Sequence, residues 1–234
     1  MRARSPLPLA LLCLAAWPAG AQTPATGNAI WPEADYSLQL TSNVRVDARG
    51  QLKDGTDYAY QQWSVGGEFF YQWQRILARH AENVDRNKEH HVVLGAGYEY
   101  LQTDQPTPAK FEHRLVLDLG LNFRPAERLL LNDRNQYEYR WVDGNYSTRY
   151  RNRLELDYDV RPHPRPVRPY VAAEFFYDVT AASWNEEQYT AGIEWPLART
   201  MTLATYYLLQ ECTSCAPAHQ NVLGITWSAY GVLR

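Results

Sequence analysis

The 234-residue sequence lacks the features that mark disordered, nucleic-acid-binding or helical membrane proteins. Only 21% of its residues are charged and 45% are hydrophobic, which excludes a disordered polyampholyte. The mean hydropathy of -0.51 excludes a bundle of transmembrane helices, and the net charge of -3 provides no basic excess for a nucleic-acid partner. The 13 Gly and 14 Pro residues form no linker-like cluster, so we expect one folding unit.

Aromatic residues, by contrast, are abundant. They make up 13% of the chain, with 17 Tyr, 8 Trp and 6 Phe. Tyr and Trp favour positions with one apolar side and one hydrated side. The sequence contains no phosphate-binding loop, dinucleotide-binding fingerprint or nucleic-acid-binding motif. Composition therefore indicates where the protein lies more clearly than what it does.

The beginning of the chain has the pattern of a secretory signal peptide. Two arginines precede an apolar run at residues 9–17, and the small residues Ala19-Gly20-Ala21 follow at cleavage spacing. The apolar run is shorter than the roughly 20 residues that a membrane-spanning helix needs. We therefore expect residues 1–21 to be removed and residues 22–234 to form an exported domain.

Apolar residues recur at every second position through most of the remaining chain, which is typical of β-strands. In residues 111–123 the apolar side chains fall on odd positions, and charged or polar ones fall on even positions. In residues 149–161 the parity is reversed, and every side chain on the odd face is charged: Arg149, Arg151, Arg153, Glu155, Asp157, Asp159 and Arg161.

The same pattern predicts ten strands, separated by turn residues such as Arg49-Gly50 and Asp143-Gly144. Residues 74–89 fit three interpretations: an extension of the preceding strand, a short helix or a long turn. The ten predicted ranges are 36–47, 58–73, 90–101, 111–124, 130–142, 148–161, 169–180, 187–197, 200–210 and 220–232.

The length of these strands favours a membrane protein. Most span about 10 to 14 residues, whereas strands of globular proteins have roughly 5 to 6. Membrane-spanning strands need roughly 9 to 11 tilted residues, and bacterial barrels combine an apolar outside with a polar inside. Aromatic residues near strand ends fit the girdles of such barrels: Tyr71, Trp73, Tyr98, Tyr100, Phe111, Phe123, Tyr139, Trp141 and Trp195.

We therefore predict an all-β fold, a transmembrane antiparallel up-and-down β-barrel of about ten strands with a polar, charged lumen. The expected location is the bacterial outer membrane. The alternative is a soluble β-sandwich or lipocalin-like barrel, in which the same alternation points apolar side chains inward.

Charged side chains in a narrow lumen need partners, so we predict an ionic network inside the barrel. The alternative is that each charge is hydrated separately. The predicted network comprises Glu112, Arg114, Asp118, Arg134, Glu138, Arg140, Arg149, Arg151, Arg153, Glu155 and Asp157.

The hairpin within residues 130–161 predicts specific partners. A turn near Asn145 places Glu138 opposite Arg153, and it places Arg134 opposite Asp157. The same register brings two further arginines together, Arg140 and Arg151, which then require Glu138, Glu112 or water nearby.

Cys212 and Cys215 are the only cysteines beyond the predicted signal peptide. Their spacing can mark a redox site or half of a zinc site, but the chain offers neither a βαβ context nor a second ligand pair. We therefore predict a local disulfide in the last external loop, as expected in an oxidising compartment.

The six histidines provide no clear metal site. His90 and His91 are adjacent in a strand and point to opposite faces, so one metal ion would rarely bind both. We expect no metal and no cofactor. His113 lies on the apolar parity near an external strand end, and we interpret it as a residue at the lipid headgroup level rather than as part of a nucleophile–base pair.

Several segments of the chain resemble a known family. They are DRNQYEYRW at residues 133–141, RYRNR at 149–153, EHR at 112–114, PYV at 169–171 with EFF at 174–176, and NVLG at 221–224. Together they resemble the family of bacterial proteins known as domain of unknown function (DUF) 2490. The resemblance implies an outer-membrane β-barrel without an assigned activity.

Three functions are consistent with these features. The first is a narrow pore or a structural component of the membrane that is not an enzyme. The charged lumen would set the selectivity of such a pore. The second is an outer-membrane enzyme that modifies lipids, and the third is a soluble periplasmic barrel that binds a ligand. The expected partners are outer-membrane lipids and small polar solutes, with no nucleic acid.

Overall fold

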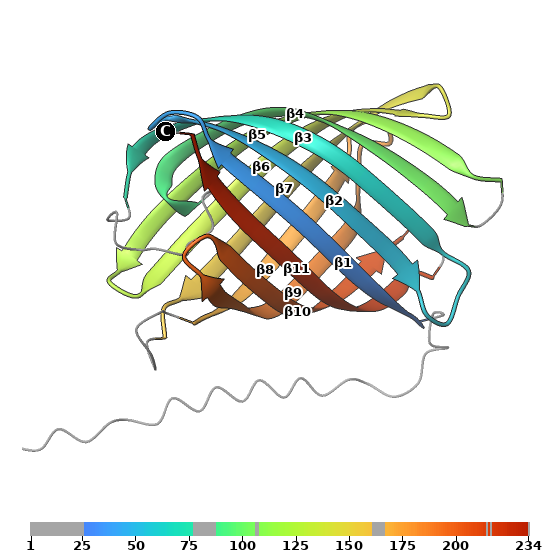
Figure 1. Ribbon diagram of the computed structural model, residues 1–234. Helices are drawn as coiled ribbons and strands as arrows, with labels where there is room; N and C mark the ends of the chain where they lie inside the picture. The colour runs from blue at the N-terminus through green and yellow to red at the C-terminus, as the bar shows by residue number, and fades with distance from the viewer. Residues whose placement is uncertain are drawn as a thin grey trace, which may run out of the picture.

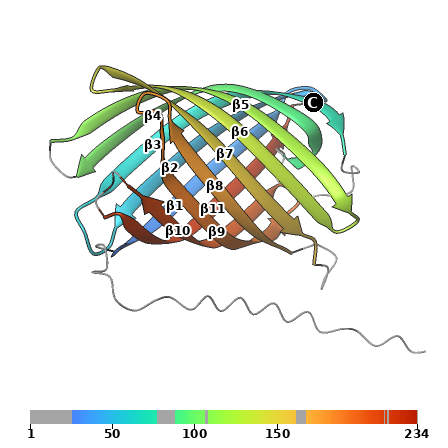
Figure 2. The same cartoon turned by 180° about the vertical axis from the view of Figure 1, so that it is seen from behind.

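The protein forms a closed β-barrel (Figures 1 and 2). This computed structural model describes residues 26–76, 88–105, 108–160, 167–213, 215 and 217–233, so the predicted signal peptide lies outside it. The eleven strands within the described residues are β1 (Thr26–Gln39), β2 (Val44–Gly55), β3 (Gln61–Arg75), β4 (His90–Gln105), β5 (Lys110–Ala126), β6 (Leu129–Val142), β7 (Asn145–Tyr158), β8 (Arg168–Asp178), β9 (Ser183–Ala198), β10 (Met201–Cys212) and β11 (His219–Val232).

The first and last strands close the barrel in parallel orientation. β1 lies between β2, with which it is antiparallel, and β11, with which it is parallel (Figure 1). Ile30 of β1 is the Cα partner of Leu223 of β11. All other neighbouring pairs are antiparallel. The prediction of about ten strands in a fully antiparallel barrel was therefore wrong in strand number and in the closing pair.

The error lies at the predicted strand 36–47, which spans the end of β1, a turn and the start of β2. This turn contains neither Gly nor Pro. The Thr41 hydroxyl accepts hydrogen bonds from the backbone amides of Asn43 (3.3 Å) and Val44 (3.1 Å), so a side chain replaces the usual turn residues. Arg49-Gly50, which was predicted as a turn, lies inside β2.

The first half of β1 was not predicted at all. Pro32, Glu33 and Asp35 interrupt its apolar alternation. The β1–β2 ladder skips Trp31 and Pro32, because proline has no amide hydrogen to donate, while the β1–β11 ladder continues past both residues.

The other nine predicted strands correspond to β3–β11, with boundaries that differ by up to four residues. Of the ambiguous residues 74–89, the structure places Arg75 at the end of β3. Lys88 and Glu89 are buried just before β4, and residues 77–87 lie outside the described chain.

The barrel carries its apolar side chains on the outside and its charges on the inside. The exposed outer wall includes Val65, Phe69, Leu94, Leu115, Leu117 and Leu223, and aromatic residues such as Trp73, Phe111, Phe123 and Trp195 lie near strand ends. The buried interior includes Arg45, Arg114, Glu138 and Glu174. None of the described residues forms a helix that is long and apolar enough to cross a membrane.

The connections divide between the two ends of the barrel. The β10–β11 connection lies at one end and contains the Cys212–Cys215 disulfide, so we name it the disulfide end. The β3–β4 connection lies at the opposite end, which we name the Lys88 end.

The parallel closure can be tested by crosslinking. In a double variant with Ile30→Cys and Leu223→Cys, a short thiol-reactive crosslinker is expected to join the two side chains, because they are neighbours on the outer wall. The linkage is read by mass spectrometry after proteolysis. Ile30→Cys paired with Leu209→Cys on β10 is the control, and preferential linkage of that pair would exclude the β1–β11 contact.

Candidate functional site

An internal cavity of about 810 Å³ occupies the barrel, and side chains from all eleven strands line it. At the disulfide end the lining includes Lys53 and Glu186, and at the Lys88 end it includes Asp47, Lys88 and Thr202. The cavity lining therefore extends from one end of the strands to the other.

The register of the β6–β7 hairpin determines which charges meet in this cavity. Asp143 and Gly144 form its turn with φ of 48° and 81°, and positive φ at both positions fits the tight type I′ turn of two-residue hairpins. Glu138 is consequently opposite Arg149. The turn predicted at Asp143-Gly144 is therefore confirmed, whereas the register centred near Asn145 was wrong.

The predicted partners change with the register. Arg153 lies opposite Arg134 rather than opposite Glu138. Asp157 lies opposite Leu130, so the predicted pair of Asp157 and Arg134 is also wrong.

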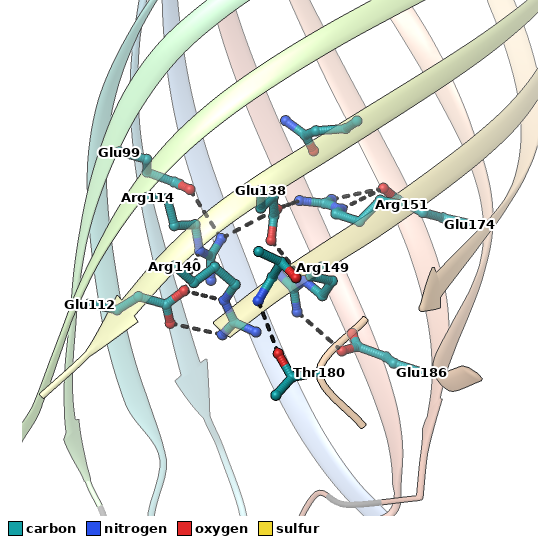
Figure 3. A network of polar contacts seen from close by, with 12 residues as sticks. Glu99, Glu112, Arg114, Glu138, Arg140, Arg149, Arg151, Glu174, Thr180 and Glu186 are labelled. Carbon is teal, nitrogen blue, oxygen red and sulfur yellow. Dashed lines mark hydrogen bonds and ion pairs between the residues drawn. The ribbon is translucent and has the colours of Figure 1, made fainter. Parts of the chain in front are cut away.

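Glu138 is the centre of the ionic network on this wall (Figure 3). The residue is fully buried, and its two carboxylate oxygens accept hydrogen bonds from Arg149 Nε (2.7 Å) and Arg151 Nη1 (2.9 Å). Arg114 Nη1 lies 3.9 Å from Oε1. One buried carboxylate thus faces three guanidinium groups.

On the β4–β6 side, Glu112 and Glu99 neutralise the charges of Arg114 and Arg140 (Figure 3). Glu112 binds Arg140 through both of its oxygens, with Arg140 Nη2 2.9 Å from Oε2, and it also accepts a hydrogen bond from Arg114 Nε. Arg114 Nη1 donates to Glu99 at 3.0 Å. Arg140 is opposite Ser147 and not beside Arg151, so the predicted contact between these two arginines was wrong.

On the other side of Glu138, the carboxylate of Glu174 on β8 neutralises three further guanidinium contacts. It lies 2.8 Å from Arg151, 3.2 Å from Arg134 and 3.5 Å from Arg153. The last two arginines are direct cross-strand partners, so the shared carboxylate offsets their repulsion. Arg153 also binds Glu155 at 2.6 Å.

Lys88 continues the network at its end of the barrel. Its ammonium group binds the carboxylates of Glu155 and Asp157 (2.8 Å) on β7, and it lies 3.5 Å from Glu194 on β9. Its side chain is nearly fully buried. Since Lys88 precedes β4, this contact crosses the interior at the Lys88 end.

The structure thus brings ten of the eleven predicted network residues into one chain of contacts. Asp118 is outside this chain and accepts a hydrogen bond from Gln136 at 3.2 Å. Four members of the network were not predicted from the sequence: Glu99, Lys88, Glu174 and Glu194. Glu99 and Glu174 lie on polar parities that the alternation could have identified, whereas the position of Lys88 had no periodic signal.

The other walls of the lumen differ in character. On β1 and β2, Arg49 lies 3.0 Å from Asp35 and 3.8 Å from Glu33. The ammonium of Lys53 lies 4.1 Å from the centre of the Trp31 ring. β10 contributes only uncharged lining residues: Thr202, Ala204, Tyr206, Leu208, Gln210 and Cys212.

A disulfide joins Cys212 to Cys215 where they line the mouth of the cavity. The carboxylate of Glu186 lies within 4.8 Å of both sulfur atoms. Because the sulfur atoms are bonded to each other, neither is available here as a thiolate ligand. Burial raises the pKa of the nearby Tyr60 phenol above its ordinary value, so this lining residue stays neutral at physiological pH.

The histidine of the outer wall contacts tyrosines. The Tyr98 hydroxyl and His113 Nδ1 form a hydrogen bond of 2.5 Å, and the Tyr100 ring lies 5.2 Å from the imidazole ring. His91 Nδ1 lies 2.8 Å from the carbonyl oxygen of Asn122.

Residues 23–219 match the family described as "Protein of unknown function (DUF2490)". No curated protein and no solved structure gives a significant match to the chain.

Removing the central carboxylate is expected to destabilise the barrel. Glu138→Leu removes the buried carboxylate that Arg149 and Arg151 share and leaves Arg151 only Glu174, so we expect the free energy of unfolding to fall by about 3–5 kcal/mol. Urea titration of the protein refolded into lipid vesicles measures this change. Glu127→Leu in the exposed β5–β6 turn is the control, and equal stability of the two variants would contradict the network.

Proposed function

The chain belongs to the DUF2490 family of proteins of unknown function, and we propose that it is an outer-membrane β-barrel that acts as a narrow pore for small polar solutes. The observation that carries this proposal is the polarity of the closed wall. Large apolar side chains face outward, and an ionic lumen surrounds a cavity lined along the length of the strands.

The outer wall supports a location in lipid. Val65, Phe69, Leu94 and Leu223 are each about half exposed or more, and such side chains on all sides of a barrel would be unfavourable in water. A closed ladder leaves no strand edge unpaired, which a hydrocarbon environment requires. The predicted signal peptide fits export to the outer membrane.

The soluble ligand-binding alternative fits less well. A water-soluble barrel has its apolar faces inside and its charges in solvent. Here the small buried apolar cluster comprises Ala29, Trp31, Leu208 and Val222, while Glu138 and Asp157 are among the most buried side chains.

The lumen supports passage of small polar molecules rather than catalysis. The β4–β9 side presents alternating guanidinium and carboxylate groups, whereas β10 presents neutral side chains. Polar solutes can exchange hydration for such groups, and Lys88 adds an ion-paired ammonium group at one end of the barrel. The carboxylates and cationic groups of the network are paired with one another, so we propose that the protein is not an enzyme.

The Tyr98–His113 contact supports a role at the membrane surface. Both side chains are on the outer wall, and His113 lies near the disulfide end of β5, where a polar side chain can reach lipid headgroups. We interpret this contact as an anchor of the barrel rather than as a lipid-modifying site.

Fractionation and bilayer recording test the pore directly. The full chain is expected in the outer-membrane fraction as a heat-modifiable band, because an intact barrel migrates differently before boiling. The purified protein is expected to produce discrete conductance steps in a planar lipid bilayer. A membrane-inserted barrel without conductance would exclude the pore, and recovery in the soluble fraction would exclude the membrane location.

Reversing one lumen charge should change the ion selectivity of the pore. Lys53 lines the cavity outside the central network, so Lys53→Glu should preserve the fold. We expect the cation-to-anion permeability ratio to rise roughly threefold, since the local potential becomes more negative.

The reversal potential across a salt gradient measures this ratio. Asp54→Asn alters charge at the same end of β2 but on the outer parity, so it should leave selectivity near that of the unaltered protein. Identical reversal potentials for Lys53→Glu and the unaltered protein would show that ions do not pass this side chain.

A further inference from the structure

The apolar outer wall contains a polar cluster on β6 and β7, which we name the Asp133 cluster. It comprises Asp133, Asn135, Tyr150 and Asn152, all half-buried. Asn135 and Asn152 are cross-strand partners near the middle of both strands. The cluster therefore lies well away from the hydrated ends of these two strands.

The cluster forms hydrogen bonds within itself but does not use all of its polar atoms. Asn152 donates to Asp133 Oδ1 (2.7 Å) and to Asn135 Oδ1 (3.1 Å), and Asn135 also donates to Asp133 Oδ1 (3.3 Å). The Tyr150 hydroxyl donates to Asn135 Oδ1 at 2.5 Å. Within the described chain, Asp133 Oδ2 and Asn152 Oδ1 accept no hydrogen bond.

The surroundings of the cluster are apolar. Asp133 lies between its cross-strand partners Leu121 and Leu154, and Asn135 is opposite Leu119 on β5. Asn152 is opposite Phe175 on β8. In acyl chains, unfilled carboxylate and amide groups are unfavourable, so polar side chains on such a surface favour association with another polar surface.

We infer that the Asp133 cluster is the contact between two copies of this chain in the membrane. This inference rests on the proposed membrane location. A two-fold axis along the membrane normal between β6 and β7 sets β6 of one copy against β7 of the other. The free Oδ1 of Asn152 then faces the second N–H of the partner's Asn135, which is not used within the described residues, and the reciprocal contact forms at the same time.

A second copy suits these groups better than a basic membrane partner. Each copy has an unused N–H on the amide of Asn135 and an unused amide oxygen on Asn152, so two copies complement each other through these two groups. Flanking leucines provide apolar contact around the polar centre. The two-fold arrangement also limits assembly to a dimer, because each copy uses the same patch once.

Crosslinking of single cysteines in native membranes tests the dimer. Leu154→Cys places a thiol beside the cluster, and Ile30→Cys places a thiol with the same exposure on β1, across the barrel (46% and 47% exposed). Mild oxidation should link Leu154→Cys copies into a species of twice the mass and leave Ile30→Cys monomeric. Adding Asn152→Leu should lower the linked fraction about tenfold, whereas adding Thr205→Leu on β10 should not.

The other outcomes overturn the proposal in distinguishable ways. Monomeric Leu154→Cys in the outer-membrane fraction removes the dimer but leaves the membrane barrel intact. Linkage to a species of different mass assigns the surface to another membrane protein, and equal linkage of both cysteine variants indicates random collision. Recovery of the chain in the soluble fraction removes the membrane location, and the dimer with it.

Discussion

The structure depends on the mutual neutralisation of charges that a closed barrel forces into its interior. Glu138 is fully buried, and only the guanidinium groups of Arg149, Arg151 and Arg114 make its ionised form tolerable there. Those arginines in turn require Glu112, Glu99 and Glu174, so the contacts form a continuous network from β4 to β9. The apolar outer wall alone would permit many registers between neighbouring strands. A shifted register would separate the buried ion pairs and would therefore be less stable.

The same network gives the lumen its functional character. Carboxylates and guanidinium groups on one side face uncharged β10 side chains on the other, which leaves a polar cavity rather than a packed apolar core. Lys88 joins β7 and β9 across one end, and the disulfide lies at the mouth of the other. In the pore that we propose, the charge of the lining would set which solutes pass.

Much of the architecture could be predicted because the alternation of apolar and polar residues shows which face of a strand is apolar. This holds whether that face contacts lipid, water or protein. Residues 111–123 and 149–161 gave both the strands and the lumen charges. The number of strands was harder to predict from this alternation. The Thr41 turn uses a side-chain hydroxyl in place of Gly or Pro, and Pro32 interrupts the pattern of β1, so neither end of that strand had its usual signal.

The sequence by itself determined the all-β class, the polarity of each strand and the residue types of the lumen, because these follow from composition and a two-residue period. Only the tertiary structure decided the partners. Asp143-Gly144 was predicted as a turn, but the two-residue geometry that sets Glu138 opposite Arg149 came from the structure, since register depends on backbone geometry at the turn. The parallel β1–β11 closure and the position of Lys88 depend on strands distant in sequence meeting around a closed ring, which no local pattern encodes.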